Sequence, residues 1–242
     1  MTKQDVTVVL LAGGLATRLP GKLMLDVAGE TMLARAYRQL TSSGWPCVVS
    51  TRHAHAAQIH AALERSQNAQ GLPCAVEIAF DEIEHGGPLE GLRRGLNYVR
   101  TPLAFAAAAD IPDLSAKFCA KLLAAYEEAP APKPAAVLPT WPDGKVEPLA
   151  ALYDVKLVAR GADAALRSGR RKVTAAIDGL NVLEYPVTPE DAHVLRNINT
   201  PDDYESYGQI NSSATRSIAE GDQVRSNATG VRSRTWTLRR KA

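Results

Sequence analysis

Two glycines and two basic residues follow a short apolar segment near the start of the chain. Gly13 and Gly14 come directly after the apolar run 6–12, and Arg18 and Lys22 follow within one loop length. Glycine has no Cβ, so its backbone takes positive φ angles and lets a polyanion approach the N–H groups closely. Arginine and lysine are well suited to holding phosphate oxygens. The segment therefore indicates a phosphate-binding loop, with a tight turn bearing solvated basic side chains as the alternative.

The glycine segment differs from two familiar nucleotide-binding loops. Gly14 is followed by LATRLPGK, without the GK[ST] ending of a Walker A loop. The segment also lacks the GxGxxG spacing and the acidic ribose partner of a dinucleotide-binding fold, which disfavours a dehydrogenase.

An aspartate ends an almost wholly apolar segment of the chain. Residues 102–109 read PLAFAAAA and are followed directly by Asp110. A carboxylate at the carboxyl end of a buried strand lies where open α/β sheets bind ligands. Capping of the next helix is the alternative role, but Asp113 or Ser115 is closer to that helix start. Asp110 is therefore a candidate ligand of a nucleotide or metal.

A second glycine pair opens a helical segment, 86–99, shortly after the predicted strand 74–80 and Asp81. Pro88 suits the first turn of a helix, and Leu89, Leu92, Leu96 and Val99 recur at helical spacing. The N-terminus of such a helix presents a positive dipole end to an anion. An ordinary strand-to-helix connection is the alternative.

Two further polar groups lie in the second half of the chain. Asn197 and Asn199 flank one residue, so their side chains share a face if the segment is extended, and Thr200 and Pro201 then begin a helix. A basic cluster ends the predicted helix 155–168 and comprises Arg167, Arg170, Arg171 and Lys172. Basic residues are favoured at a helix C-terminus whatever the function.

Strand-like and helix-like segments alternate and place these residues at strand ends. Strands are predicted at 6–12, 45–51, 74–80, 102–109, 137–140 and 182–186, and helices at 29–39, 54–65, 86–99 and 155–168. Asp143-Gly144 predicts a hairpin turn within 141–154, after a proline-rich bridge at 129–136. Three strand-helix units precede Asp110, so we expect a three-layer α/β/α fold with a mostly parallel, doubly wound, Rossmann-like sheet.

Charge and composition separate a body from a tail. The chain has 242 residues, 45% of them hydrophobic and 22% charged, as is ordinary for a globular protein. Residues 209–242 carry a net charge of +5, and the remainder carries −3. We therefore predict one domain at 1–208 and a basic, disordered tail at 209–242. The mildly acidic body argues against a nucleic-acid partner.

Other features bear on location and on metal binding. Three widely spaced cysteines, Cys47, Cys74 and Cys119, favour a reducing compartment over a disulfide scaffold. No apolar run is long enough for a membrane span, and the N-terminus lacks a signal-peptide pattern, so we expect a cytoplasmic protein without a membrane partner. The histidines at 53, 55 and 60 lack an accompanying carboxylate and are not expected to bind a metal.

Five sequence blocks together resemble one enzyme family. They are LAGG at 11–14 with Arg18 and Lys22, GPLxGL at 87–92, D-x-P at 110–112, EPLAALY at 147–153 and NxNTP at 197–201. In this order, spanning 6–205, they resemble the molybdenum cofactor guanylyltransferases, which are nucleotidyltransferases of the nucleotide-diphospho-sugar transferase fold. Between Arg18 and Lys22 the chain has only Leu-Pro-Gly, which is shorter than is usual in that family.

The resemblance implies a reaction and a set of site residues. GMP would pass from GTP to the phosphate of molybdopterin, with release of pyrophosphate and with Mg²⁺ as cofactor. Cofactor-biosynthesis proteins or molybdoenzyme chaperones would be possible partners. The implied catalytic residues are Arg18, Lys22 and Asp110, with Asp110 binding the metal; the nucleotide contacts are Leu11, Ala12, Gly13, Gly14, Lys22, Asp81, Gly87, Pro88, Leu89 and Asp110; and the acceptor contacts are Arg171, Lys172, Asn197 and Asn199. Asp81 would contact the base or the ribose.

Two alternatives to guanylyl transfer remain open from the sequence. One is a related nucleotidyltransferase, acting on the same pterin with CTP or on a sugar phosphate or phospholactate. The second glycine of LAGG, in place of alanine, favours GTP. The other is a non-catalytic nucleotide-binding regulator, which the shortened loop at Pro20 suggests.

Overall fold

A seven-stranded sheet forms the centre of the molecule. The computed structural model describes residues 5–14, 18–70, 76–83 and 86–209. The strands lie in the order β5 (Glu77–Phe80), β4 (Cys47–Thr51), β1 (Val6–Leu11), β6 (Leu103–Ala108), β8 (Ala150–Asp154), β7 (Ala136–Thr140) and β9 (Val182–Pro186). Only β8 runs against its neighbours, pairing antiparallel with β6 and β7. The predicted mostly parallel, doubly wound sheet is confirmed.

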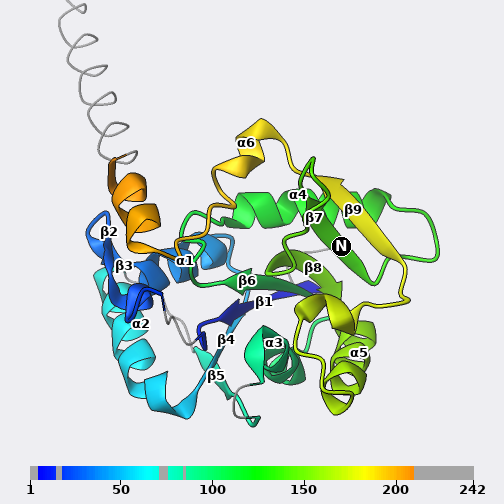
Figure 1. Cartoon of the computed structure of the whole chain (residues 1–242), viewed down its shortest axis with the longest axis horizontal. Coiled ribbons are helices and arrows are strands. Elements are labelled where there is room, and N and C mark those ends of the chain that lie inside the picture. The colour runs from blue at the N-terminus through cyan, green and yellow to red at the C-terminus, as the bar shows by residue number, and fades with distance from the viewer. Residues whose placement is uncertain (1–4, 15–17, 71–75, 84–85, 210–242) are drawn as a thin grey trace, which may run out of the picture.

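Helices cover both faces of this sheet (Figure 1). The longer helices are α1 (Met32–Thr41), α2 (Ala56–Gln70), α3 (Gly87–Tyr98), α4 (Ala116–Glu128) and α5 (Val155–Arg167), and α6 (Pro189–Ala192) is a single turn. Residues of α1, α2 and α4 pack with Val8 and Leu10 of β1, whereas α3 and α5 pack with Val9. Because successive strand residues point to opposite faces, one apolar strand supplies both halves of the core.

Helix starts are fixed by short polar side chains. Thr31 Oγ1 accepts from Ala34 N in α1, and Ser115, one of the two residues expected near the start of α4, accepts from Phe118 N through its Oγ. Thr200 Oγ1 accepts from Asp203 N at the start of the helix 201–209. Because Ser115 caps α4, Asp110 is not needed for that role.

Several short elements depart from the predictions. The first helix after β4 begins as a 3₁₀ turn at His53–His55, and further 3₁₀ turns lie at Lys22–Met24 and Val173–Ala176. A two-stranded ribbon, β2 (Asp26–Val27) with β3 (Glu30–Thr31), was not predicted, because two residues a strand are too few to show a period. The predicted tail lies outside the described residues, apart from Gln209. Within the described part of the chain, no helix combines the length and apolarity needed to cross a bilayer.

Candidate functional site

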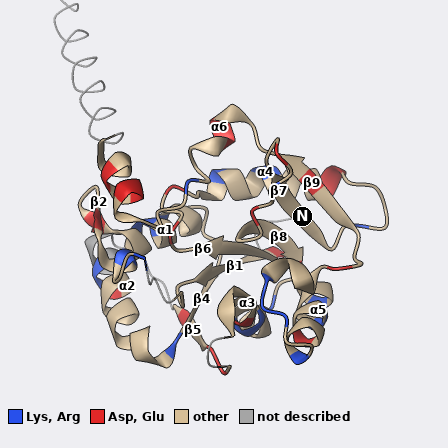
Figure 2. Cartoon of the chain, in the orientation of Figure 1, with Lys and Arg blue, Asp and Glu red and all other residues tan. Residues whose placement is uncertain are grey.

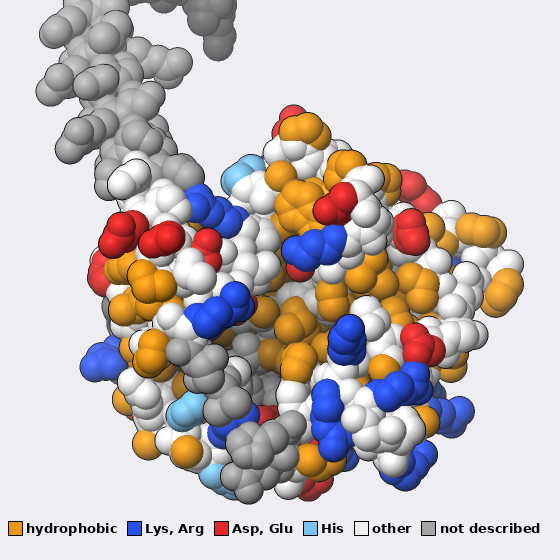
Figure 3. Space-filling model, viewed as in Figure 1, with side chains coloured by type: hydrophobic (Ala, Val, Ile, Leu, Met, Phe, Trp, Pro, Cys, Tyr) orange, Lys and Arg blue, Asp and Glu red, His pale blue; other side chains and the backbone are white. Residues whose placement is uncertain are grey.

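A cavity of about 740 Å³ opens at the carboxyl ends of β1 and β6. The two strands are parallel neighbours, so the glycine turn after β1 and Asp110 after β6 meet at the same sheet edge. Figure 3 shows apolar side chains in the middle of the viewed face, with Lys and Arg side chains around them. The predicted site residues that line the cavity are Leu11, Ala12, Gly13, Gly14, Arg18, Lys22, Asp81, Gly87, Pro88, Asp110, Asn197 and Asn199.

Three predicted site residues do not line the cavity. Leu89 is fully buried in the core between α3 and the sheet, so its side chain packs away from the cavity and the predicted nucleotide contact would have to come from its backbone. Arg171 and Lys172 are exposed. Arg171 lies beside the start of α3, because a Cβ added to Gly87 would be 3.5 Å from Arg171 Cβ. Figure 2 shows Lys and Arg residues, in blue, in the region between α3 and α5. The structure therefore places Arg171 next to the cavity edge.

Lys22 lies inside the cavity and joins two segments that are far apart in the chain. Its Nζ is 2.6 Å from Asp110 Oδ2 and 2.9 Å from Asn199 Oδ1, and it also donates to the carbonyl of Ile198 at 3.3 Å. The side chains of Lys22 and Asp110 are only 11% and 20% exposed. Because burial weakens solvent screening, this ion pair is stronger than one at the surface. Lys22 therefore sits at the centre of the site despite the short loop that precedes it.

Asp110 keeps one carboxylate oxygen for a ligand. Oδ2 is taken by Lys22, whereas Oδ1 is buried without a hydrogen-bond partner among the described residues. The described residues contain no cluster of three or more His, Cys, Asp or Glu side chains. Mg²⁺ commonly binds through one or two carboxylates together with substrate phosphates and waters. The free Oδ1 in a cavity with a phosphate-binding loop fits such an ion.

Two asparagines of the segment 197–199 line the same cavity as the glycine turn. Asn197 and Asn199 both line the cavity, and Ile198 between them is fully buried. Asp203 Oδ2 accepts from the backbone N–H groups of Asn199 and Thr200, both at 2.9 Å. These bonds lower the pKa of Asp203, so its carboxylate stays ionised and fixes the segment.

Asp81 lies against the glycine turn from the neighbouring side. Its N–H donates to the carbonyl of Thr51 at 3.0 Å, which continues the pairing of β5 with β4. A Cβ on Gly13 would come within 3.0 Å of Asp81 Oδ2, so any side chain at this position would press on the carboxylate. Asp81 Oδ1 is buried without a partner among the described residues. Burial and, after it, the charge of Glu90 raise the pKa of Asp81.

Replacing Asp81 with asparagine is expected to stabilise the fold at neutral pH. Because the pKa of Asp81 is raised in the folded state, its contribution to stability is full below the unfolded-state pKa and is lost as the pH rises through the folded-state pKa. Thermal denaturation should therefore show a higher Tm for Asp81→Asn at neutral pH and a shrinking difference in acid. A lower Tm for the variant at neutral pH would contradict the conclusion that the buried charge of Asp81 destabilises the fold.

Charged residues of the β7–β8 hairpin also line the cavity and were not predicted as site residues. Glu147 Oε1 accepts from Trp141 Nε1 at 2.8 Å and from Lys145 Nζ at 2.7 Å. Lys145 and Glu147 lie two positions apart, which places both on one face of an extended segment. This spacing is the feature of the sequence that could have identified the two residues as neighbours on one face. Arg52, which follows β4, lines the cavity as well.

The sequence comparisons point to one family. The model of the MobA-like NTP transferase domain matches residues 8–182. A probable molybdenum cofactor guanylyltransferase of Natronomonas pharaonis is 30% identical over 82% of this chain and 95% of its own length. A molybdenum cofactor guanylyltransferase of Burkholderia vietnamiensis is 32% identical over 71% of this chain and 80% of its own length.

Solved structures show the same fold. Molybdopterin-guanine dinucleotide biosynthesis protein A from Archaeoglobus fulgidus superposes with a TM-score of 0.66 at 24% identity, covering 86% of this chain and 99% of its own. A 4-diphosphocytidyl-2C-methyl-D-erythritol synthase from Anaerococcus prevotii gives a TM-score of 0.66 at 12% identity, covering 87% of this chain and 100% of its own. At these identities the likeness shows the fold alone.

Proposed function

Since the chain belongs to the MobA-like NTP transferase family, we propose that it transfers GMP from GTP to the phosphate of molybdopterin. The observation that carries the proposal is the meeting of the glycine turn, Lys22 and Asp110 in one cavity. Backbone N–H groups, a cation and a carboxylate in one cavity are the groups that a triphosphate and its counter-ion need, which supports the proposal. The relatives named as guanylyltransferases support GTP and molybdopterin as the substrates.

The reaction is an in-line displacement at the α-phosphorus of GTP. An oxygen of the molybdopterin phosphate forms the new bond to this phosphorus, and the bond to the bridging oxygen breaks and leaves its electron pair on pyrophosphate. The nucleophile is already an anion, so no general base is required. Such transfers depend on positioning and on neutralising charge. Both come from the residues along the triphosphate. The backbone N–H groups at Gly13 and Gly14 position it, and the side chains of Arg18 and Lys22 neutralise its charge.

Asp110 is the residue that would hold Mg²⁺. Its unpartnered Oδ1 would be the ligand atom, together with oxygens of the nucleotide phosphates. The metal would neutralise charge on the phosphate oxygens as pyrophosphate leaves. Lys22, fixed on the other carboxylate oxygen, keeps Asp110 from rotating away.

The two ends of the cavity suit the two substrates. Asp81 and the start of α3 at Gly87 and Pro88 form the nucleotide end, where Asp81 contacts the base or the ribose. The hairpin residues Lys145 and Glu147, with Asn197, also line the cavity and are the candidate contacts of the acceptor. Arg171 lies beside Gly87, at the start of α3 where the nucleotide is proposed to bind, so the geometry does not favour its predicted contact with the acceptor.

The proposal is tested by nucleotide and acceptor specificity. We expect pyrophosphate release from GTP only when molybdopterin is present, and much less from CTP or UTP. Turnover with CTP in place of GTP would assign the chain to cytidylyl transfer to the same pterin. A rise in Tm with GTP but no pyrophosphate with any acceptor would indicate a non-catalytic regulator.

The location and further partners follow from the same proposal. A reaction that consumes GTP, together with the odd number of widely spaced cysteines, favours the cytoplasm. The product would pass to molybdoenzymes or their chaperones, and the basic residues of 209–242 are a candidate contact segment for such proteins.

A further inference from the structure

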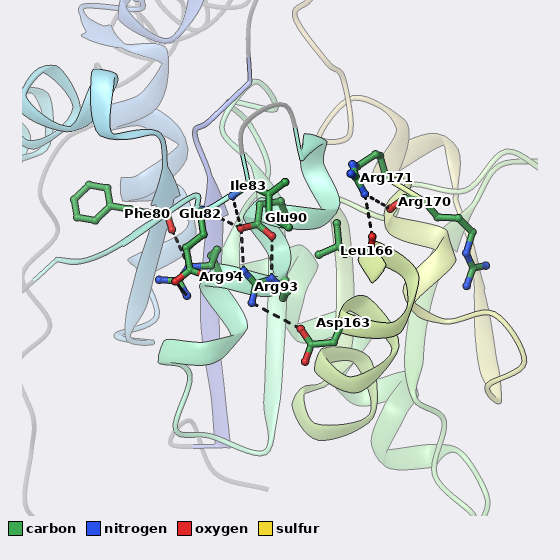
Figure 4. A network of polar contacts seen from close by, with 10 residues as sticks. All are labelled: Phe80, Glu82, Ile83, Glu90, Arg93, Arg94, Asp163, Leu166, Arg170 and Arg171. Carbon is green, nitrogen blue, oxygen red and sulfur yellow. Dashed lines mark hydrogen bonds and ion pairs between the residues drawn. The ribbon is translucent and has the colours of Figure 1, made fainter. Parts of the chain in front are cut away.

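Glu90 is a fully buried carboxylate that the proposed reaction does not use. It lies in the first turn of α3 with no exposed surface. Its Oε1 accepts from the backbone N–H groups of Glu82 at 2.9 Å and Ile83 at 3.2 Å, and its Oε2 accepts from Arg93 Nε at 2.9 Å. Figure 4 shows these bonds running from the helix to the segment after β5. Burying a charge is unfavourable unless it is well paired, so this arrangement calls for a reason.

The bonds of Glu90 end on the two residues that follow Asp81. On the other side of Asp81, Arg94 Nε donates to the carbonyl of Phe80 at 2.8 Å. Arg94 and Arg93 also pair with the carboxylate of Glu82, at 2.7 Å and 2.9 Å. The backbone is therefore held immediately before and immediately after Asp81, by side chains of one helix.

Asp81 depends on this support because its own carboxylate is weakly anchored. Asp81 Oδ1 is buried, lines the cavity and makes no hydrogen bond of good geometry to the described residues, although Ser50 and Arg52 lie near enough to lower the pKa of the carboxyl group. The direction of the side chain is then set by the backbone that carries it. Preorganised groups of this kind are effective only when their supporting shell is rigid.

The approach of Glu90 to the segment also constrains Gly86. A Cβ at Gly86 would be 2.5 Å from Glu90 Cβ and 3.0 Å from the carbonyl oxygen of Ile83. The carboxylate stays charged, because the bonds from Arg93 and Glu82 N–H outweigh burial and lower the pKa of Glu90. A simple favourable interaction with the helix dipole would need neither the bonds to Glu82 and Ile83 nor this close passage.

We propose that Glu90 is a positioning residue that fixes the direction of the Asp81 carboxylate toward the base or the ribose of the nucleotide. The inference rests on the proposed function. It assigns nucleotide selectivity partly to a residue that does not touch the nucleotide. Arg93 serves as the counter-ion that keeps Glu90 charged.

The test uses Glu90→Gln in the full-length chain with GTP and two analogues. The amide keeps the size of the side chain, but one of its two terminal atoms is an N–H donor. This donor either faces Arg93 or replaces the oxygen that accepts the two hydrogen bonds from the backbone of Glu82 and Ile83. We expect KM for GTP to rise about tenfold with kcat within about twofold. Inosine triphosphate, which lacks the 2-amino group, reports on the base contact, and 3′-deoxy-GTP reports on the ribose contact. Whichever preference Asp81→Asn weakens, Glu90→Gln should weaken as well.

A double-mutant cycle separates positioning from general damage. In the Asp81→Asn background, Glu90→Gln should raise KM no further, because the group it positions is gone. Asp163→Asn is the matched control, since it removes an outer contact of Arg93 at 3.7 Å and leaves the bonds of Glu90 in place; it should leave KM unchanged. If Glu90→Gln does not fold, Arg94→Gln, which removes the bond to Phe80, should weaken the same preference.

Distinct results would overturn the inference or the proposed function. An equal loss of kcat/KM for GTP and both analogues, or a full further loss in the Asp81→Asn background, would show that Glu90 acts only on stability. Absence of GTP turnover in the unaltered protein would instead contradict the proposed function.

Discussion

Replacing Asp110 with asparagine is expected to lower kcat for pyrophosphate release about 10³-fold. Asparagine keeps the shape of the side chain but removes the charge that Oδ1 offers to a cation and that Oδ2 offers to Lys22. The loss should persist at saturating GTP, because the missing group acts on charge that develops as pyrophosphate leaves. Steady-state kinetics over a range of Mg²⁺ concentrations measure the effect.

A neighbouring aspartate provides the control for Asp110. Asp113 Oδ1 pairs with Arg35 Nη2 at 2.8 Å and accepts from the Tyr207 hydroxyl at 2.8 Å, but it does not line the cavity. Asp113→Asn should therefore lower Tm and leave kcat within a few-fold. Binding of Mn²⁺, followed in the presence of GTP by its paramagnetic resonance signal, should weaken only in the Asp110 variant. Unchanged turnover of Asp110→Asn would remove this residue from the chemistry.

The fold was predictable where the residue pattern within one segment is enough to identify a strand or helix and its end. The apolar run of β1 stops at two glycines, and that of β6 stops at Asp110, so both strands and the ends that carry the site follow from local sequence. Leu89 shows the limit of transferring a role by resemblance. Its spacing with Leu92 and Leu96 predicted a core face, and the structure places all three in the core.

The remaining site residues depend on packing between distant segments. Nothing local links Lys22 to Asn199, which lie 177 positions apart, yet they bond in the cavity. Glu90 in the first turn of a helix has the sequence pattern of a solvated or dipole-favoured acid. Its burial arises because α3 lies against the segment after β5, and helical periodicity does not report that contact. The spacing of Lys145 and Glu147 shows that they share a face, but that this face lines the cavity depends on how their hairpin pairs in the sheet.

Replacing Lys22 with methionine is expected to lower kcat/KM for GTP about 10²- to 10³-fold. The ammonium group is the described cation in contact with Asp110, and it lies in the same cavity as the glycine turn. When GTP binds, the phosphate oxygens gain this positive charge, and methionine keeps the volume of the stem without it. Lys22→Arg keeps the charge in a larger planar group, so we expect partial activity.

Lys121 offers a matched control, because it also pairs with a buried aspartate. Lys121 Nζ is 2.5 Å from Asp191 Oδ1, and the Asp191 side chain is only 3% exposed. Lys121→Met and Lys22→Met should both lower Tm, since each leaves a poorly solvated carboxylate without its cation. Only Lys22→Met should lose activity.

The dependence on Mg²⁺ decides what Lys22 does. If the charge of Lys22 acts on the phosphates, raising the Mg²⁺ concentration should not restore kcat of Lys22→Met. A metal bound at Asp110 Oδ1 would not occupy the position of the missing ammonium group. Lys22 also holds Asn199 and the carbonyl of Ile198, so the variant should show a higher KM for molybdopterin as the segment 197–199 loosens. Full recovery at high Mg²⁺ would instead mean that Lys22 only neutralises Asp110 until the metal binds.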